Sequence, residues 1–286
     1  MNEVSGDRIF RARDRILDLA RPVVMGILNT TPDSFSDGGR YQTVEEALGQ
    51  IASMVEAGAE IIDVGGESTR PGSDPVSLEE EMERVLPVLR QAVGTFDEVL
   101  FSIDTTKYEV ASDALEAGVH IVNDVSGLKK EPRLAKLCSD YEAGYILMHS
   151  QGDPKTMQND PDYEDVIGDL KNFFEKQIAI LQKEGVDRII LDPGIGFGKK
   201  LEHNLEIING LDQFLDFGFP LMVGASRKSM IGRLLDNRPV DERLAGTLAV
   251  HYHCLMKGAL LLRVHDVQEA KDSIRIFTAI QQAEKQ

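Results

Sequence analysis

The stretch VVMGILN, residues 23–29, is a continuous apolar run that ends on an amide side chain. Strands with one solvent-exposed face alternate apolar and polar residues, whereas unbroken apolar runs are typical of parallel strands covered on both faces. The ten residues TTPDSFSDGG (30–39) follow, and helical spacing begins at Val44. Strand-to-helix connections usually take about 2–6 residues. The stretch therefore predicts a buried parallel strand followed by a long loop kept for function.

Seven further apolar runs recur along the chain, and segments with helical spacing separate them. Capping boxes at Thr43-x-x-Glu46 and Ser77-x-x-Glu80 predict the starts of two of these helices. Eight strand–helix units in about 260 residues are typical of a (β/α)8 TIM barrel. The seven runs are EIIDVGG (60–66), VLFSIDT (99–105), VHIVNDV (119–125), GYILMHS (144–150), RIILDPG (188–194), FPLMVGAS (219–226) and ALLLRVHDV (259–267).

A doubly wound sheet also alternates strands with helices and is the main rival fold. Its phosphate-binding fingerprint is missing, because GIGFGK (194–199) is spaced G-x-G-x-G rather than G-x-G-x-x-G. No linker or low-complexity stretch divides the chain. We therefore predict an α/β protein whose residues 1–286 form a single TIM-barrel domain, with a core from about residue 20 to residue 270.

The composition narrows the classes of partner. The 286 residues carry a formal net charge of -17, whereas nucleic-acid binders need a basic face. A few placed arginines and lysines still allow an anionic small substrate. No apolar run approaches the roughly 20 residues of a membrane span, and the N-terminus lacks the apolar core of a signal peptide. Cys138 and Cys254 form no disulfide framework. We expect a cytoplasmic protein with buried thiols and neither a nucleic-acid nor a membrane partner.

Polar side chains end or follow all eight apolar runs. In a barrel, the carboxyl ends of the strands converge on the face where active sites lie. Turn chemistry favours Asn and Asp but does not explain Arg, Lys and His at such positions. A polar pocket is therefore predicted at this face. These side chains are Asn29, Asp63, Asp104, Asn123, Asp124, His149, Asp192, Ser226, Arg227, Lys228, Arg263 and His265.

The predicted pocket combines two kinds of chemistry. Carboxylate and amide groups suit a planar heterocycle with N–H donors and ring acceptors. Arginines and lysine, together with a helix start near Ser229, suit a carboxylate or phosphate. The pocket should therefore take a heterocycle that carries, or meets, an anion. The first set is Asp104, Asp192, Asn29 and Asn123, and the second is Arg70, Arg227, Lys228 and Arg263.

Eight motifs in order make the chain resemble the dihydropteroate synthase family from about residue 20 to 270. The resemblance implies a TIM-barrel transferase of folate biosynthesis. Its reaction condenses 6-hydroxymethyl-7,8-dihydropterin diphosphate with 4-aminobenzoate to 7,8-dihydropteroate and pyrophosphate. The motifs are GILNTTPDSFSDGG (26–39), GGESTRPG (65–72), SIDTTK (102–107), NDVSG (123–127), MHSQGDP (148–154), LDPGIGFGK (191–199), GASRKS (224–229) and LRVHDV (262–267).

The resemblance also implies roles for individual residues. The pterin-binding set would be Asp104, Asn123, Met148, Asp192 and Lys228. The diphosphate would meet Asn29, Arg70, Arg263 and His265, and Asn29 would also be a ligand of a Mg²⁺ cofactor. The aminobenzoate would be framed by Thr69, Arg70, Pro71, Phe197 and Ser229. The catalytic set would be Lys228, Arg263, His265 and Asp104. Sulfonamide-type inhibitors and a homodimer are further family expectations.

The same resemblance gives the long loop a purpose. The loop after Asn29 and the loop 65–72 resemble mobile loops that close over the leaving pyrophosphate. A cationic pterin intermediate would be attacked by water in an open site, so closure has a physical reason. Neutralisation of the leaving charge by Mg²⁺, Arg263 and His265 would be the main catalytic effect. The neutral arylamine is already nucleophilic, so its orientation matters more than its activation.

Four residues receive a structural interpretation instead. Asp63 is expected to be a buried carboxylate, hydrogen-bonded by the Gly65–Gly66 turn. His149 is expected to satisfy a backbone group and is left out of the catalytic set. His251 and His253 lie beside Cys254, but helix positions two apart face different ways, so a shared metal is not expected.

Three other functions compete with this interpretation. A pterin-binding methyltransferase domain would share the Asp and Asn ligands but would not need the Arg263-x-His265 pair. A non-catalytic paralogue would bind pterin, yet its loop motifs should be degraded, whereas both are intact here. A phosphate-binding aldolase with Lys228 as a Schiff-base residue would leave Asp104, Asn123 and Asp192 unexplained.

Overall fold

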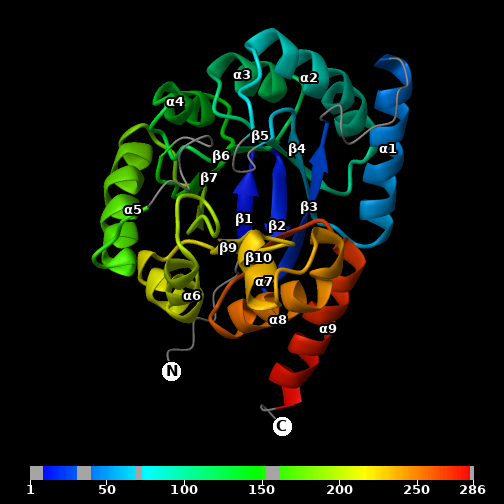
Figure 1. Ribbon diagram of the computed structural model, residues 1–286. Helices are drawn as coiled ribbons and strands as arrows, with labels where there is room; N and C mark the ends of the chain where they lie inside the picture. The colour runs from blue at the N-terminus through cyan, green and yellow to red at the C-terminus, as the bar shows by residue number, and fades with distance from the viewer. Residues whose placement is uncertain (1–8, 31–39, 69–72, 153–160, 284–286) are drawn as a thin grey trace.

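Eight parallel strands form a nearly closed barrel, with helices around it (Figure 1). The computed structural model describes residues 9–30, 40–68, 73–152 and 161–283, and for residues 40–43 the backbone alone. The barrel strands run in the order β8-β7-β6-β5-β4-β3-β10-β9. They are β3 (Val23–Asn29), β4 (Ile61–Gly65), β5 (Leu100–Asp104), β6 (Ile121–Asp124), β7 (Gly144–Met148), β8 (Ile189–Asp192), β9 (Met222–Val223) and β10 (Leu261–Val264).

The TIM-barrel prediction is confirmed, and each predicted apolar run contains one barrel strand. The ring closes least completely between β8 and β9, where a single bridge joins Leu191 to Leu221. One of the backbone hydrogen bonds of this bridge runs from the Leu191 amide to the Pro220 carbonyl at 2.9 Å. Strand β9 is two residues long, so little backbone is available there for pairing.

Helices follow the strands and cover the outside of the barrel (Figure 1). Their inner faces and the outward-facing strand residues share one apolar core. This arrangement explains why the strands read as continuous apolar runs, since both faces are covered. The helices are α1 (Arg40–Glu56), α2 (Leu78–Thr95), α3 (Tyr108–Glu116), α4 (Arg133–Asp140), α5 (Val166–Lys183), α6 (Leu201–Asn209), α7 (Ser229–Leu234), α8 (Leu244–Met256) and α9 (Val267–Ala283).

The two predicted helix starts had different outcomes. Ser77 is the N-cap of α2, and its hydroxyl accepts a hydrogen bond from the Glu80 amide at 3.1 Å, as predicted. Helix α1, however, begins at Arg40, so the prediction that Thr43 caps it was wrong. The helix starts directly after Gly38-Gly39 in the sequence. Glycines favour a helix boundary more strongly than the capping pattern does here.

An antiparallel hairpin, which the sequence analysis did not predict, closes the amino-terminal end of the barrel. It consists of β1 (Ile9–Ala12) and β2 (Arg15–Asp18). Phe10, Leu17 and Leu19 pack with the inward-facing residues at the starts of the barrel strands in a second apolar core. The hairpin therefore shuts water out of the end of the barrel opposite the strand carboxyl ends.

The inside of the barrel changes from apolar to polar along the strands. Strand side chains that face the interior recur every two residues. At the amino-terminal level they are apolar, and several are replaced by polar groups two residues further on. Hydrogen bonds from Arg263 and Asn123 to Asp63 show that these polar groups meet inside the barrel. The pairs are Ile61 and Asp63, Ile121 and Asn123, Ile190 and Asp192, and Leu261 and Arg263.

The expectation of buried thiols is confirmed. Cys138 and Cys254 are both buried free thiols, and burial raises the pKa of Cys254 to about 12. No helix among the described residues is both long and apolar enough to cross a membrane.

The hairpin makes a prediction about stability. Phe10 is 4% exposed, and its ring lies so close to Gly144 that a Cβ there would approach it to 2.7 Å. Phe10→Ala should lower the free energy of unfolding by about 3–5 kcal/mol through lost burial and an unfilled cavity. Urea denaturation followed by circular dichroism measures this. Ile16→Ala, at a side chain 55% exposed, is the matched control and should cost about 0.5 kcal/mol or less. Equal effects would contradict a sealing role for the hairpin.

Candidate active site

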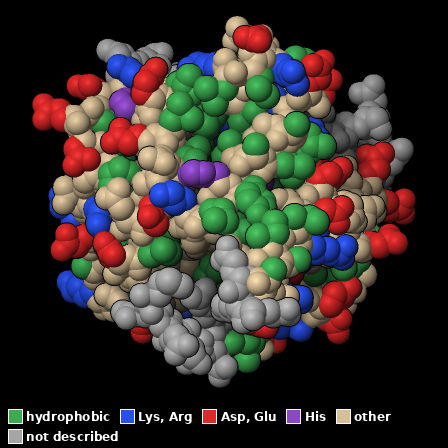
Figure 2. Space-filling view, turned by 90° about the horizontal axis from the view of Figure 1, so that it is seen from below, with side chains coloured by type: hydrophobic (Ala, Val, Ile, Leu, Met, Phe, Trp, Pro, Cys, Tyr) green, Lys and Arg blue, Asp and Glu red, His purple; other side chains and the backbone are tan. Residues whose placement is uncertain are grey.

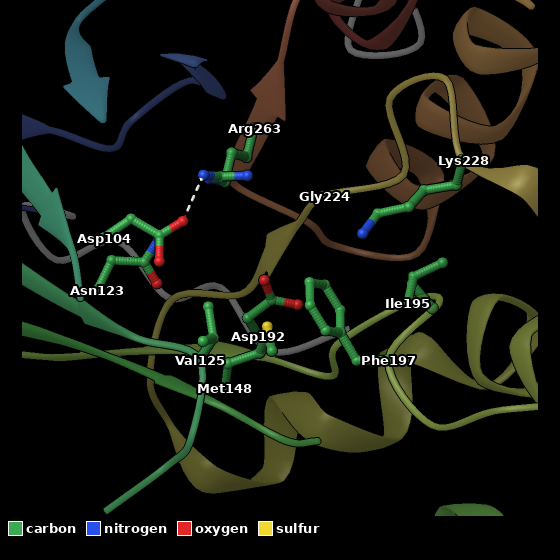
Figure 3. A pocket seen from close by; sticks show the side chains of 10 residues that line it. All are labelled: Asp104, Asn123, Val125, Met148, Asp192, Ile195, Phe197, Gly224, Lys228 and Arg263. Carbon is green, nitrogen blue, oxygen red and sulfur yellow. Dashed lines mark hydrogen bonds and ion pairs between the residues drawn. The ribbon is translucent and has the colours of Figure 1, made fainter. Parts of the chain in front are cut away.

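A pocket opens at the level where the strand side chains become polar (Figure 3). Its volume is about 320 Å³ including space open to solvent. All five residues predicted to bind pterin line it, together with Phe197 and Arg263. The complete lining is Asp104, Asn123, Val125, Met148, Asp192, Ile195, Phe197, Gly224, Lys228 and Arg263.

Arg263 is shared by two buried carboxylates at one side of the pocket. Its Nε donates to Asp63 Oδ2 at 2.6 Å. Its Nη2 donates to Asp104 Oδ2 at 2.8 Å, and this second contact is drawn in Figure 3. The Asn123 amide also donates to Asp63 Oδ2, at 3.0 Å. Asp63 is buried, as predicted, but its partners are Arg263 and Asn123 rather than the Gly65–Gly66 turn. The reason is that residue 63 faces the barrel interior, where the strands bring these side chains to it.

The charges in this cluster do not balance, since two carboxylates share one guanidinium. Burial raises the pKa of Asp104 to about 7; Arg263 opposes the rise, while the nearby carboxylates, Asp63 foremost, add to it. Burial works against the charge of Arg263, but Asp63 and Asp104 outweigh it and raise the pKa of Arg263. Arg263 therefore stays charged, and Asp104 is able to gain or lose a proton near neutral pH.

Two acceptor oxygens in the pocket wall have no partner within the described chain. They are Asp104 Oδ1 and Asn123 Oδ1, both buried. A buried acceptor without a donor costs free energy, about 1–3 kcal/mol for a neutral group. A ligand that brings N–H or O–H groups to these oxygens would remove that cost. The pocket is therefore built to accept hydrogen bonds from a ligand.

Asp192 ends β8 on the opposite wall. Its Oδ1 accepts a hydrogen bond from the Gly194 amide at 2.8 Å, which fixes the orientation of the carboxylate. Burial raises the pKa of Asp192, while the Gly194 amide and Lys228 oppose the rise. The carboxylate is thus oriented from behind.

Lys228 and Phe197 lie next to one another in the pocket lining (Figure 3). The Lys228 ammonium lies 3.9 Å from the centroid of the Phe197 ring, a cation–π contact. Lys228 is the N-cap residue of α7, and the exposed Ser229 is its first residue. This wall offers a positive charge beside an aromatic surface, which suits an aromatic anion.

The remaining predicted residues lie around the pocket rather than in its lining. Asn29 is half-buried at the end of β3. His265 follows β10, where its Nδ1 lies 3.0 Å from Ser226 Oγ. Arg227 was expected among the pocket cations, but it forms an ion pair with Asp266, its Nε donating to Oδ2 at 2.9 Å. Asp124 accepts hydrogen bonds from the Tyr145 hydroxyl and two turn amides, so it stabilises the β6 turn.

Several predictions lie outside the described residues. Thr69, Arg70 and Pro71 belong to them, as does most of the loop after Asn29. In the described part of the chain, no group of three or more His, Cys, Asp or Glu side chains is placed to hold a metal ion. His251 is buried and His253 is exposed, so they lie on different faces of α8, as expected.

Two kinds of site residue were missed from the sequence. Val125, Ile195 and Gly224 line the pocket; Val125 and Ile195 follow the polar strand ends Asp124 and Asp192 by one and three residues, and Gly224 directly follows β9. Their place directly after those strand ends was the available signal. Lys199 was quoted only as part of a glycine-rich motif, yet it is a fully buried lysine that contacts the strand ends. Nothing in its sequence context distinguishes it from an exposed lysine.

Comparison with known proteins agrees with the chemistry of this pocket. The family described as "Pterin binding enzyme" matches residues 25–265. This range contains all of the barrel strands except the first two residues of β3. The fold and pocket thus define a pterin-binding TIM-barrel enzyme. The chain is 47% identical over 270 residues to dihydropteroate synthase of Escherichia coli K12, covering 94% of this chain and 95% of the relative.

Solved structures give the same result. The Yersinia pestis dihydropteroate synthase, in a sulfonamide drug complex, superposes with a TM-score of 0.90 at 43% identity and covers 96% of this chain and 99% of its own. The Xanthomonas albilineans synthase with 4-aminobenzoic acid has a TM-score of 0.90 at 39% identity, with the same coverage. The chain belongs to the dihydropteroate synthase family, the transferases of folate biosynthesis that form 7,8-dihydropteroate, which confirms the resemblance seen in the sequence.

The buried Asp104 predicts a pH dependence of stability. Its folded pKa of about 7 exceeds the ordinary value of 3.8. Between these values the folded state retains a proton that the unfolded state releases, so the contribution of Asp104 to stability falls as pH rises. The quantity to follow is the difference in free energy of unfolding between the wild type and Asp104→Asn. This difference should decline from about pH 4 to pH 7, by up to about 1 kcal/mol per pH unit. Urea denaturation at each pH measures it.

Asp97→Asn provides the control for this experiment, because Asp97 is an exposed carboxyl outside the pocket. Its curve should run parallel to that of the wild type. Parallel curves for Asp104→Asn as well would show that Asp104 does not carry the raised pKa.

Proposed function

We propose that this chain condenses 6-hydroxymethyl-7,8-dihydropterin diphosphate with 4-aminobenzoate, and that the pocket lining holds the pterin. The supporting observation is the set of acceptors around it: two unpartnered buried oxygens on one wall and the oriented carboxylate of Asp192 on the other. A pterin edge presents several N–H groups in one plane. A carboxylate accepts two parallel hydrogen bonds from such an edge.

Within that arrangement, Asp104, Asn123 and Asp192 orient the pterin, and Lys228 lies at its open edge. Met148 supplies apolar contact beneath the ring. The hydrogen bonds from ligand N–H groups favour the ionised form of Asp104, whose pKa is raised to about 7 when no ligand is bound. Binding would therefore be coupled to loss of a proton from Asp104 near neutral pH.

The diphosphate belongs at the rim between β3 and β10. Three residues are near these strand ends: Asn29, His265 and Arg263, which is held by two carboxylates. Arg70, outside the described residues, is proposed to join them. Asn29 offers one hard oxygen ligand, and Mg²⁺ usually takes most other ligands from substrate phosphates and water. The donor set therefore fits an ion that arrives with the diphosphate. When bound, Mg²⁺ would neutralise charge on the leaving pyrophosphate.

The aminobenzoate is proposed to lie against Phe197, with Lys228 and Ser229 near its carboxylate and Thr69, Arg70 and Pro71 framing it. The cation beside an aromatic ring supports this placement. The related structures contain 4-aminobenzoic acid and a sulfonamide drug, which supports binding of both classes of molecule by this chain as well.

The residues of this chain then have limited but definite tasks. Arg263 and His265 stabilise the negative charge that develops on the departing pyrophosphate. The acceptor walls hold the pterin so that its exocyclic carbon faces the arylamine, and the neutral amine attacks without an activating base. Exclusion of water protects the electrophilic carbon during the transfer. Asp63 takes part indirectly, because it holds Arg263 and Asn123.

We also propose a single catalytic domain, a cytoplasmic location and a homodimer. Large apolar side chains on α8 and α9 support the dimer: Met256 is 56% exposed, Ile276 60% and Ile280 47%. Figure 2 shows apolar side chains gathered on the face seen from below in Figure 1, the side where these helices lie. A contiguous apolar patch of this kind often marks a protein interface.

Pyrophosphate release tests the proposed reaction. The wild type should release pyrophosphate from the pterin diphosphate and form dihydropteroate when 4-aminobenzoate is present. Lys228→Ala should lower kcat/KM on the order of 100-fold or more, because it removes the cation beside the reacting groups. Lys176→Ala, at an exposed lysine of α5, is the matched control and should match the wild type. Pterin binding without turnover would identify a non-catalytic paralogue, and borohydride trapping of a substrate on Lys228 would identify an aldolase.

Removal of divalent metal tests the role of Asn29. Chelation should stop turnover, and added Mg²⁺ should restore it. Asn29→Ala should need roughly ten times more Mg²⁺ for half-maximal rate, since one oxygen ligand is lost. Asn172→Ala, at an exposed amide of α5, should keep the wild-type requirement. An unchanged requirement in Asn29→Ala would remove Asn29 from the metal site.

A further inference from the structure

Lys199 is a buried cation that the proposed reaction does not use. Lys199 is 2% exposed and does not line the pocket. Its Nζ lies 2.9 Å from the Gly194 carbonyl oxygen, 3.1 Å from that of Phe197 and 3.2 Å from that of His149. It also lies 3.0 Å from His149 Nδ1. Its hydrogen-bond partners in the described chain are thus three carbonyls and one ring nitrogen, not a carboxylate.

Such a site is costly, which argues for a specific purpose. Burial lowers the pKa of Lys199 to about 7. Burial together with Lys199 and Lys129 lowers the pKa of His149 to about 2, so the ring stays neutral and its Nδ1 accepts a hydrogen bond from the ammonium. A buried cation without a carboxylate is usually less stable than an apolar side chain of the same size. Packing alone would therefore favour a methionine here.

The Gly194 and Phe197 carbonyls converge because three glycines of the loop that follows β8 adopt left-handed conformations. Gly194, Gly196 and Gly198 have φ values of 68°, 83° and 62°. A Cβ on Gly194 would lie 1.9 Å from the His149 carbonyl oxygen, so the loop rests directly on the end of β7. Lys199 fills the centre of this loop and ties the ends of β7 and β8 together.

Two pocket residues, Asp192 at the end of β8 and Phe197 in the loop, are connected to Lys199 through the loop backbone. The Gly194 amide donates to Asp192, while the Gly194 carbonyl accepts from Lys199. The Phe197 carbonyl accepts from Lys199, while the Phe197 ring carries the cation–π contact with Lys228. The Tyr163 hydroxyl fixes the other side of the loop by donating to the Gly198 carbonyl at 3.0 Å.

We infer that Lys199 is a positioning residue: by binding the Gly194, Phe197 and His149 carbonyls, it holds Asp192 and Phe197 in the orientations that receive the pterin and the aminobenzoate. The assignment of those two ligands rests on the proposed function, whereas the effect on the position of Phe197 does not.

The first test reports on the loop without any ligand. The chain contains no tryptophan, so Phe197→Trp introduces a single fluorescent probe into the pocket wall. In that background, Lys199→Met should shift the emission to longer wavelength and increase quenching by acrylamide, because the ring loses its fixed place beside Lys228. Lys176→Met removes an exposed lysine and should change neither value. Emission and quenching unchanged by Lys199→Met would overturn the inference, whether or not the protein proves to bind pterin.

The second test measures binding of the pterin diphosphate by the otherwise unaltered chain. Lys199→Met should weaken binding on the order of 10- to 100-fold, since a displacement of about 1 Å has effects of that size. In the double variant Lys199→Met/Phe197→Ala, the loss of pterin affinity should be smaller than the product of the two single losses, because both changes act on the same wall of the pocket. A general loss of stability would not produce this non-additivity. Multiplying losses would overturn the inference.

Lys199→Arg covers the case in which the methionine variant does not fold. Arginine keeps the charge, but its planar fork directs the donors differently. Lys199→Arg should therefore give an emission wavelength and a pterin affinity between those of the protein with Lys199 and those expected for Lys199→Met. Wild-type values for both would overturn the inference. Failure of the wild type itself to bind pterin, together with a shifted emission in Lys199→Met, would reject the proposed substrate while supporting the positioning role.

Discussion

The ion cluster of Arg263 with Asp63 and Asp104 is the interaction on which the inside of this barrel depends. The three side chains come from β10, β4 and β5, and Asn123 of β6 joins them through Asp63. Four strands are thus cross-linked at the level where the apolar core ends. A buried carboxylate is tolerable there only because a guanidinium is shared with it, and removing either partner would leave an uncompensated charge. The cluster also leaves acceptor oxygens unused, and these define the recognition chemistry of the pocket.

The opposite wall is organised by different means. Between β3 and β8, each neighbouring pair of strands is in continuous register, but the β8 and β9 side is formed by a glycine-rich loop and a two-residue strand. Side-chain to backbone hydrogen bonds replace the missing ladder there, with Lys199, Asn204 and Tyr163 each binding loop backbone groups. One half of the pocket is therefore stabilised by charge and the other by backbone geometry.

Much of this arrangement was readable in the sequence, for identifiable reasons. Continuous apolar runs revealed the strands because both faces are covered, and the polar residue at each end revealed the pocket because barrel strands converge. Residues such as Asp192 and Asn123 were found in this way. Arg227 was misplaced because a strand-end position does not reveal a competing partner, in this case Asp266. The hairpin was missed because its four-residue strands are short, although the alternation in Phe10-Arg11-Ala12 was a weak signal.

The incomplete seam between β8 and β9 has a further consequence. Local opening of a protein begins where few hydrogen bonds cross, and in the described chain a single bridge connects this part of the barrel. Asp192 at the end of β8 and Gly224 just after β9 both line the pocket, with Lys228 four residues further along. A ligand that contacts both the β8 side and the β9 side would connect them across the seam. Occupancy and closure would then be linked, so that amide hydrogens along the seam exchange most slowly when the pocket is filled.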